Sequence, residues 1–243
     1  MILMRYSRPQ ISMSSCNPLS KSEKAKITRL RRKLLGWYDE NGRDFPWRRE
    51  EAGTFEKICV EVLLQRTKAE TVAAAYPKFF KKYNSWSQIA NASIAELEET
   101  LKPLGLWKRR AQSIKMLATY AHEHRGVFPA TKEELLKVTA VGQYVCNAIL
   151  LFQHGKARPL IDVNMARVIE RYLRPRKLAD IRYDPWLQAA TLWLVSDKKA
   201  INVNWAVLDF ANSICRSKKP RCCICILNKS CSYRKRTILE EPI

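Results

Sequence analysis

Apolar residues recur at helical spacing along most of the chain, whereas the strict alternation typical of strands is nearly absent. In residues 23–39, for example, Ile27, Leu30 and Leu34 fall three and four positions apart. The pattern predicts helices over about 23–39, 54–66, 69–83, 85–90, 93–102, 107–124, 131–138, 143–153, 163–173, 184–196 and 201–214. Short connections punctuated by proline or glycine join these segments, and the chain becomes cysteine-rich and loop-like after Ala211. We therefore predict an all-α protein.

A glutamate interrupts the apolar run of the helix predicted over 54–66. Glu61 lies between Val60 and Val62 in the stretch EVLLQRT, and Gln65 follows one helical turn later on the same face. Burial among apolar neighbours would raise the pKa of the Glu61 carboxyl and let it act as an acid or hydrogen-bond donor. A surface glutamate at the rim of a core helix is the alternative interpretation.

Two predicted helix starts carry further candidate chemistry. The stretch VTAVGQYVCN at 138–147 turns at Gly142 and places Tyr144 in the first turn of the next helix. Backbone N–H groups at such a helix start form an anion-binding site. Asp162 precedes the helical pattern of LIDVNMARVIERY, where an ordinary N-cap role competes with a catalytic one. A helix N-terminus is expected to keep that carboxylate ionised.

Five of the eight cysteines lie between positions 215 and 231. Cys215, Cys222, Cys225 and Cys231 form a C-x6-C-x2-C-x5-C array, with Cys223 as an additional thiol. Four thiolates satisfy an iron–sulfur cluster, while structural zinc usually takes two close cysteine pairs, of which only one is present here. The spacing therefore favours an iron–sulfur cluster over zinc. No apolar signal-peptide core appears near the N-terminus, so we expect reduced thiols.

The charge balance favours a polyanionic partner. The chain has 44 Lys and Arg against 23 Asp and Glu, a formal net charge of +21. Such a field attracts nucleic acid, although a merely soluble basic protein or a binder of acidic membranes would share it. No run of 18 or more apolar residues is present, which argues against a membrane span. We expect an intracellular protein that binds nucleic acid.

Four stretches and the cysteine array together resemble the iron–sulfur branch of the helix-hairpin-helix DNA glycosylases. The stretches are FPWR at 45–48, EVLLQRT at 61–67, the turn at 138–144 and LIDVNMARVIERY at 160–172. The family includes endonuclease III and the adenine- and thymine-mismatch glycosylases, and the resemblance runs from Trp37 to Tyr233. It implies two helical lobes with a DNA-binding cleft between them and a structural [4Fe-4S] cluster. It also implies a monomer that binds double-stranded DNA in the cytoplasm or nucleoid.

The expected domain division follows from this resemblance. Residues 21–49 plus 161–243 would form the lobe that carries the cluster loop at 215–231, and residues 50–160 would form a six-helix lobe with the helix-hairpin-helix at 131–150. Residues 1–20 would be a mobile leader.

The resemblance also assigns roles to residues. Asp162 would stabilise the cationic sugar of the transition state, and Glu61 would contact the flipped base. Arg66 would either insert into the duplex or bind a phosphate. The expected DNA-binding residues are Gln65, Arg66, Lys108, Arg109, Val141, Gly142 and Gln143, with Arg110 as a further backbone contact. Ala140 departs from the family's L-x-G-V-G hairpin, which has glycine there, and alanine tolerates a positive φ poorly.

Tyr144 makes the expected activity more specific. Bifunctional relatives have a lysine here, and a phenol cannot form its Schiff base, so a monofunctional glycosylase is expected. Thymine-type enzymes have tyrosine at this position, and the chain ends soon after Cys231, without the C-terminal domain usual in adenine glycosylases. We expect excision of thymine or uracil opposite guanine. Gln65 followed by Arg66 mixes the adenine and thymine patterns, so an adenine glycosylase, an enzyme for another damaged base and a non-catalytic DNA-binding module stay as alternatives.

Overall fold

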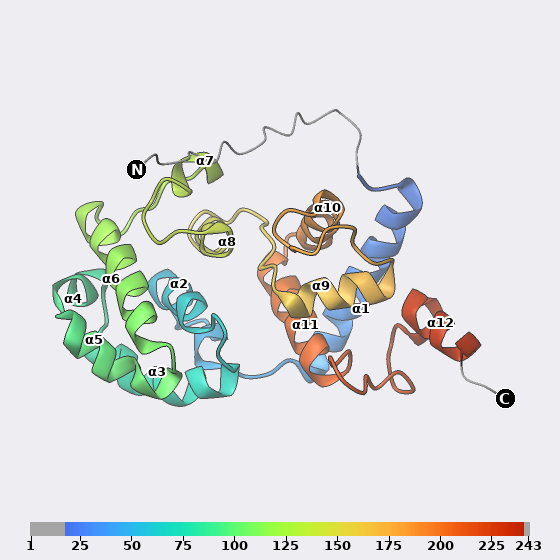
Figure 1. Cartoon of the computed structure of the whole chain (residues 1–243), viewed down its shortest axis with the longest axis horizontal. Helices are drawn as coiled ribbons and strands as arrows, with labels where there is room; N and C mark the ends of the chain where they lie inside the picture. The colour runs from blue at the N-terminus through green and yellow to red at the C-terminus, as the bar shows by residue number, and fades with distance from the viewer. Residues whose placement is uncertain (1–17, 241–243) are drawn as a thin grey trace, which may run out of the picture.

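The computed structural model describes residues 18–240, which form helices α1 to α12 and three short 3-10 segments without a β-strand (Figure 1). Cys16 and most of the predicted leader lie outside the described residues. Figure 1 shows two groups of helices side by side, which confirms the predicted all-α fold with two lobes. No helix in the described part of the chain is long and apolar enough to cross a membrane.

The first lobe is the middle of the chain. It contains α2 (Thr54–Leu63), α3 (Ala69–Lys82), α4 (Trp86–Asn91), α5 (Ile94–Leu101), α6 (Trp107–Glu123), α7 (Lys132–Leu135) and α8 (Gln143–Phe152), with the 3-10 segment η2 (Lys102–Leu104). Fully buried Ile58, Ile114 and Ile149 belong to one continuous core. Phe45, the N-cap of η1 (Pro46–Arg48), and Trp47 within it also pack in this core, a few residues before the expected start of the lobe.

The second lobe combines the two ends of the described chain. It contains α1 (Lys21–Asn41), α9 (Val163–Tyr172), α10 (Pro185–Val195), α11 (Ala200–Ser213), η3 (Asn228–Ser230) and α12 (Ser232–Glu240). The apolar stripe Ile27, Leu30 and Leu34 of α1 is fully buried against α10 and α11. Burying three such side chains contributes several kcal/mol, at roughly 1.5–3 kcal/mol each.

Helix α8 connects the lobes. Ala148 and Leu151 on α8 pack with Leu160 and with Ala200 of α11 in a small separate apolar cluster. The Leu160 N–H donates to Asn204 Oδ1 at 2.7 Å, which ties the link between α8 and α9 to α11. This contact places the beginning of α9, and therefore Asp162, at the junction of the lobes.

The predicted end of the helix that begins at Thr54 is wrong. Helix α2 ends at Leu63 and not near residue 66, because the buried Arg110 guanidinium donates to the carbonyls of Val62, Leu63 and Gln65 at the helix end. These contacts satisfy carbonyls that the next turn of helix would otherwise use.

Helix α12 was expected to be loop. Its sequence, SYRKRTILE, has no apolar stripe for periodicity to detect. The helix packs instead on α9 and η3, and the Arg171 guanidinium lies 4.8 Å from the ring centroid of Tyr233.

Candidate active site between the two lobes

Glu61 and Tyr144 meet because α2 packs against α8. The Tyr144 hydroxyl donates a hydrogen bond to Glu61 Oε2 at 2.6 Å, and the Glu61 side chain is only 3% exposed. Residues separated by more than eighty positions thus share one site. The interpretation of Glu61 as a surface residue at the rim of a core helix is wrong.

Burial raises the pKa of Glu61 to about 7. The hydrogen bond from Tyr144 and the charge of Arg48 oppose that rise, whereas the carboxylate of Asp162 adds to it. The expected desolvation of this carboxyl is therefore confirmed. A group with this pKa populates both protonation states near neutral pH, as a general acid or base requires.

Asp162 is the N-cap of α9, as the sequence predicts. Its Oδ1 accepts hydrogen bonds from the backbone N–H groups of Asn164 at 2.9 Å and Met165 at 2.8 Å. Burial nevertheless raises the pKa of Asp162, although these bonds and the charge of Arg167 limit the rise. The donors at the helix N-terminus favour the ionised form of Asp162, but desolvation opposes them and is the larger effect on its pKa.

Two polar residues behind Asp162 escaped the sequence analysis. Asn164 Nδ2 donates to Asp162 Oδ2 at 2.5 Å, and Arg167 Nη2 donates to Asn164 Oδ1 at 3.0 Å. Arg167 Nε also donates to the Cys215 carbonyl at 2.8 Å. A continuous hydrogen-bonded path therefore joins Asp162 to the first cysteine of the array. The only signal in the sequence is the pair of polar residues three positions apart near the start of α9.

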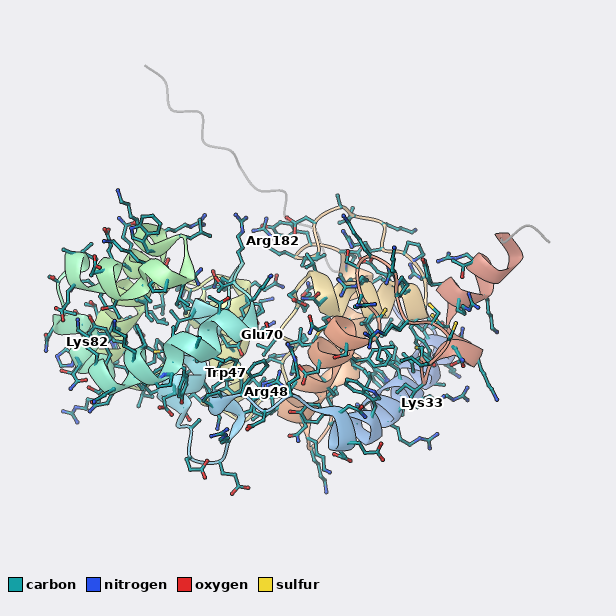
Figure 2. The ribbon with its side chains drawn as sticks, turned by 90° about the horizontal axis from the view of Figure 1, so that it is seen from below. Lys33, Trp47, Arg48, Glu70, Lys82 and Arg182 are labelled. Atoms are coloured by element: carbon teal, nitrogen blue, oxygen red, sulfur yellow. The ribbon has the colours of Figure 1, made fainter. Side chains whose placement is uncertain are left out.

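Arg48 of η1 is the third residue that the sequence analysis did not assign. Its Nη1 and Nη2 donate to Asp209 of α11 at 2.7 and 3.0 Å, and Arg43 Nε donates to the same fully buried carboxylate at 2.8 Å. In Figure 2, Arg48 and Glu70 lie between the lobes, and Arg43 completes the connection through its ion pair with Glu70 of α3. This network holds a cation near Glu61 and joins the lobes.

The helix-hairpin-helix turn is closed by a strained residue. Ala140 has φ +67°, a left-handed conformation that glycine adopts readily, and the Val141 N–H donates to the Val138 carbonyl at 3.1 Å. Gly142 is the N-cap of α8, and a Cβ there would meet no heavy atom within 4 Å. The N–H groups of the first turn of α8 have no partners within the helix. The turn therefore keeps its free donors despite alanine at position 140.

One cleft collects most of the predicted DNA-binding residues. It is lined by Gln65, Arg109, Val141, Gly142, Gln143 and Tyr144 from the first lobe, and by Ile161, Ile181 and Arg182 from the second. The Gln143 side chain is not free, because its Nε2 donates to Gln188 Oε1 at 2.8 Å. Tyr144 thus faces the cleft with Glu61 behind it.

The remaining predicted contacts separate into exposed and buried groups. Gln65 and Arg66 lie in the turn after α2, so Gln65 does not share a helical face with Glu61. Arg66 is exposed and has φ +58°. Lys108 and Arg109 are exposed on α6, whereas Arg110 is 5% exposed and its guanidinium binds the end of α2. Arg110 is therefore structural, and its expected contact with DNA is wrong.

The four cysteines of the array line one small pocket. Cys215, Cys222, Cys225 and Cys231 surround it together with Arg171, Tyr233 and Arg234. Leu227 N–H points at Cys225 Sγ at 3.4 Å, and Arg171 Nη1 points at Cys215 Sγ at 3.7 Å. As the side chains stand, no three His, Cys, Asp or Glu residues within 18–240 are gathered to hold a metal ion. The donor set nevertheless fits a thiolate-bound group, because four sulfurs and basic side chains face the same space.

Comparison with known proteins agrees with this geometry. The chain is 33% identical over 216 residues to thymine-DNA glycosylase of Aeropyrum pernix, covering 87% of this chain and 96% of that protein. It is 30% identical to adenine DNA glycosylase of Mycobacterium tuberculosis, covering 83% of this chain and 66% of that protein. The structure of a thermostable thymine-DNA glycosylase superposes with a TM-score of 0.78 at 31% identity, covering 89% of this chain and all of that one.

The matching family model covers residues 59–181, from α2 to the segment that follows α9. These residues include Glu61, the hairpin, Tyr144 and Asp162, which are the groups that the fold brings to the junction of the lobes. The chain belongs to the HhH-GPD superfamily of base excision DNA repair proteins.

Proposed function

We propose that the protein is a monofunctional DNA glycosylase that flips and removes thymine or uracil mispaired with guanine. The hydrogen bond between the Tyr144 hydroxyl and Glu61 carries this proposal, because it places a phenol and a protonatable carboxyl side by side at the cleft. The similarity to thymine-DNA glycosylases over most of the chain supports the choice of base.

In the proposed reaction, Glu61 supplies a proton and Asp162 supplies a negative charge. Cleavage of an N-glycosidic bond leaves negative charge on the departing base and positive charge on the sugar C1′. Protonated Glu61, with a pKa of about 7, would donate a proton to the base. Ionised Asp162, held by two backbone N–H groups and Asn164, would stabilise the cationic sugar and orient the water that attacks it.

The hairpin would hold the DNA while the nucleotide leaves the stack. Free N–H groups at the start of α8, beside the open surface of Gly142, suit a phosphate. Arg109 and Gln65 line the same cleft, and Lys108 and Arg66 are exposed nearby in the sequence, so we assign them contacts with the duplex. A G·T wobble pair is cheaper to open than a Watson–Crick pair, which contributes to selectivity.

Tyr144 excludes the chemistry of strand cleavage. A Schiff base with the sugar requires an amine at this position, and the phenol of Tyr144 is fully used as a donor to Glu61. We therefore expect an abasic site as the product and no covalent adduct after borohydride treatment. A trapped adduct would contradict the monofunctional assignment.

An adenine glycosylase is the second candidate. It is favoured by Gln65 at the cleft and by the 30% identity to an adenine DNA glycosylase. A panel of duplexes with G·T, G·U, A·G and A opposite 8-oxoguanine, together with deaminated and alkylated bases, separates the two. Alkali cleavage after incubation reports each abasic site. Release from G·T and G·U but not from either adenine duplex supports the thymine assignment, and the reverse pattern contradicts it.

We further propose that Cys215, Cys222, Cys225 and Cys231 hold a [4Fe-4S] cluster. When bound, the cluster supplies structural support for the loop and no step of base removal. Arg171 and the Leu227 N–H face the sulfurs, as hydrogen-bond donors to thiolates would. Broad absorption near about 400 nm and four irons per chain are expected. A colourless protein that contains zinc would contradict this assignment.

The two lobes would act together on DNA. We propose that residues 50–160 grip the strand through the hairpin, and that residues 21–49 with 161–243 present Asp162 and the cluster loop. Because its substrate is cellular DNA, we expect the enzyme in the cytoplasm or nucleoid. We expect it to act as a monomer, because one chain supplies every group that the reaction needs.

A further inference from the structure

The segment between α9 and α10 forms the second-lobe wall of the cleft. Ile181 and Arg182 of this segment line the same hollow as Gly142 and Tyr144. Neither the proposed base removal nor the phosphate contact of the hairpin uses these residues. Their position at the cleft therefore calls for a separate role.

Hydrogen bonds give this segment a defined shape. Asp184, which is 1% exposed, accepts hydrogen bonds from the backbone N–H groups of Lys177 at 2.9 Å, Leu178 at 3.0 Å and Leu187 at 2.8 Å. The Arg176 guanidinium donates to the Leu178 and Ala179 carbonyls. Both ends of the segment are thus fixed to the start of α10, so the residues between them are presented in one geometry.

Gln188 connects the segment to the hairpin. Its Nε2 donates to the Ile181 carbonyl at 2.8 Å, and its Oε1 accepts from Gln143 Nε2 at 2.8 Å. The hairpin of the first lobe and the segment of the second are therefore held in fixed positions relative to each other across the cleft. A duplex that the hairpin grips would lie beside residues 181–183.

Arg182 and Tyr183 form an exposed pair at this place. The Arg182 guanidinium lies 5.3 Å from the Tyr183 ring centroid, and Tyr183 is 68% exposed. Asp180 accepts from Arg182 Nε at 3.0 Å and from Nη2 at 2.6 Å. Because the carboxylate occupies this edge of the guanidinium and would repel a phosphate, the planar surfaces of the pair are the better binding groups.

We propose that Arg182 and Tyr183 form a stacking surface for the DNA base left unpaired when its partner nucleotide is flipped. Flipping removes the pairing and part of the stacking of that base. Aromatic rings and arginine planes bind unstacked bases without regard to sequence. This inference rests on the proposed base flipping, and it adds a contact on the second lobe that recognises the opened duplex.

A fluorescent base tests the proposal directly. The probe is a duplex with 2-aminopurine opposite a tetrahydrofuran abasic analogue, which stays uncleaved. Wild-type protein is expected to quench the 2-aminopurine. Tyr183→Ala should lose the quenching and bind about tenfold more weakly, with the same dependence of affinity on salt. Tyr183→Phe keeps the ring and should behave as wild type.

Arg32→Ala is the matched control. Arg32 is an exposed arginine next to Lys33 on α1, and Figure 2 shows Lys33 and Arg182 on opposite sides of the second lobe. This variant should leave the quenching unchanged. Arg182→Ala should reduce the quenching, whereas Arg182→Lys should restore it only in part because an ammonium has no planar surface.

Two outcomes would overturn the inference. The first is wild-type quenching by Tyr183→Ala. The second is an Arg182→Ala variant that keeps the quenching but whose affinity depends less on salt, by about one phosphate contact. That result would make Arg182 a phosphate ligand. Base release from G·T duplexes by the wild type is measured separately. Its absence alongside intact quenching would contradict the proposed function and leave the stacking surface standing.

Discussion

Glu61 and Asp162 are two carboxyl groups that the fold brings to one site but surrounds differently. Glu61 is 3% exposed, and its one side-chain donor in the site is the Tyr144 hydroxyl at 2.6 Å. Asp162 is only partly buried and accepts from two backbone N–H groups and from the Asn164 amide. Burial raises the pKa of both groups, but only Asp162 has several donors that favour its charged form. The comparison teaches that the number of hydrogen-bond donors around a buried carboxyl decides its role. Glu61, with one donor, is suited to act as an acid, whereas Asp162, with three, is suited to act as an ion.

The largest effect is expected from Asp162→Asn. Asparagine is also a good N-cap, so the fold of α9 should survive while the negative charge beside the sugar is lost. Base release under single-turnover conditions should fall by roughly 10³-fold. The thermal midpoint and the affinity for an uncleavable duplex serve as controls and should change little. Near-normal base release would show that Asp162 only caps the helix.

Glu61→Gln should give the next largest effect. The amide keeps the size and can accept from Tyr144 but cannot transfer a proton, so base release should fall roughly 10²-fold. In the wild type, release should decrease as the pH rises through about 7, because the active form is protonated Glu61. The variant should lack this decrease. A pH profile shared by both proteins would assign the titration to another group.

The pH dependence of the protein's stability should also reflect the Glu61 carboxyl. A folded-state pKa of about 7, against 4.5 for an unperturbed glutamate, means that the folded protein binds the proton more tightly. Stability should therefore be highest below about pH 4.5 for this group and should be lost as the pH rises to about 7, by at most about 3 kcal/mol. Denaturant unfolding at several pH values measures the loss, and Glu61→Gln should reduce it.

Tyr144→Phe tests the effect of the Tyr144 hydroxyl on the pKa of Glu61. The hydroxyl lowers the pKa of Glu61, so its removal should move the decrease in base release to higher pH. Loss of one hydrogen bond to a charged group, on the order of 1.5–3 kcal/mol, sets the scale of the shift at about one to two pH units. Borohydride should still trap no adduct. An unchanged profile would mean that the phenol does not act on Glu61.

The hairpin should show the smallest effects, in two directions. Ala140→Gly should stabilise the protein by about 1 kcal/mol, because alanine at φ +67° is strained. Gly142→Ala should leave stability nearly unchanged, since its φ of −88° and open surroundings accept a Cβ, but should weaken DNA binding severalfold. Thermal melting and filter binding separate the two variants. Equal DNA affinity for Gly142→Ala and wild type would place the phosphate elsewhere.

Local patterns were sufficient for most helices. The stripe on α1 and the N-cap at Asp162 follow from periodicity and capping chemistry, and both are confirmed. Helix α12 escaped detection because its stability comes from packing on α9 and not from its own apolar face. The end of α2 was misplaced because a side chain distant in sequence, Arg110, binds its final carbonyls. For this reason Gln65 was expected to share a helical face with Glu61, although it lies in the turn after α2.

Residue types and their spacing were enough to predict the helical fold, the chemistry of the candidate residues and the resemblance to a DNA repair family. Those properties depend on residue type and short-range spacing, which a linear chain displays directly. The folded chain was needed to reveal that Tyr144 donates to Glu61, that Arg48 and Arg167 act on the two carboxyls, and that Arg110 is structural. Such pairs come from helices packed across the chain, and the desolvation that sets their pKa values exists only after that packing.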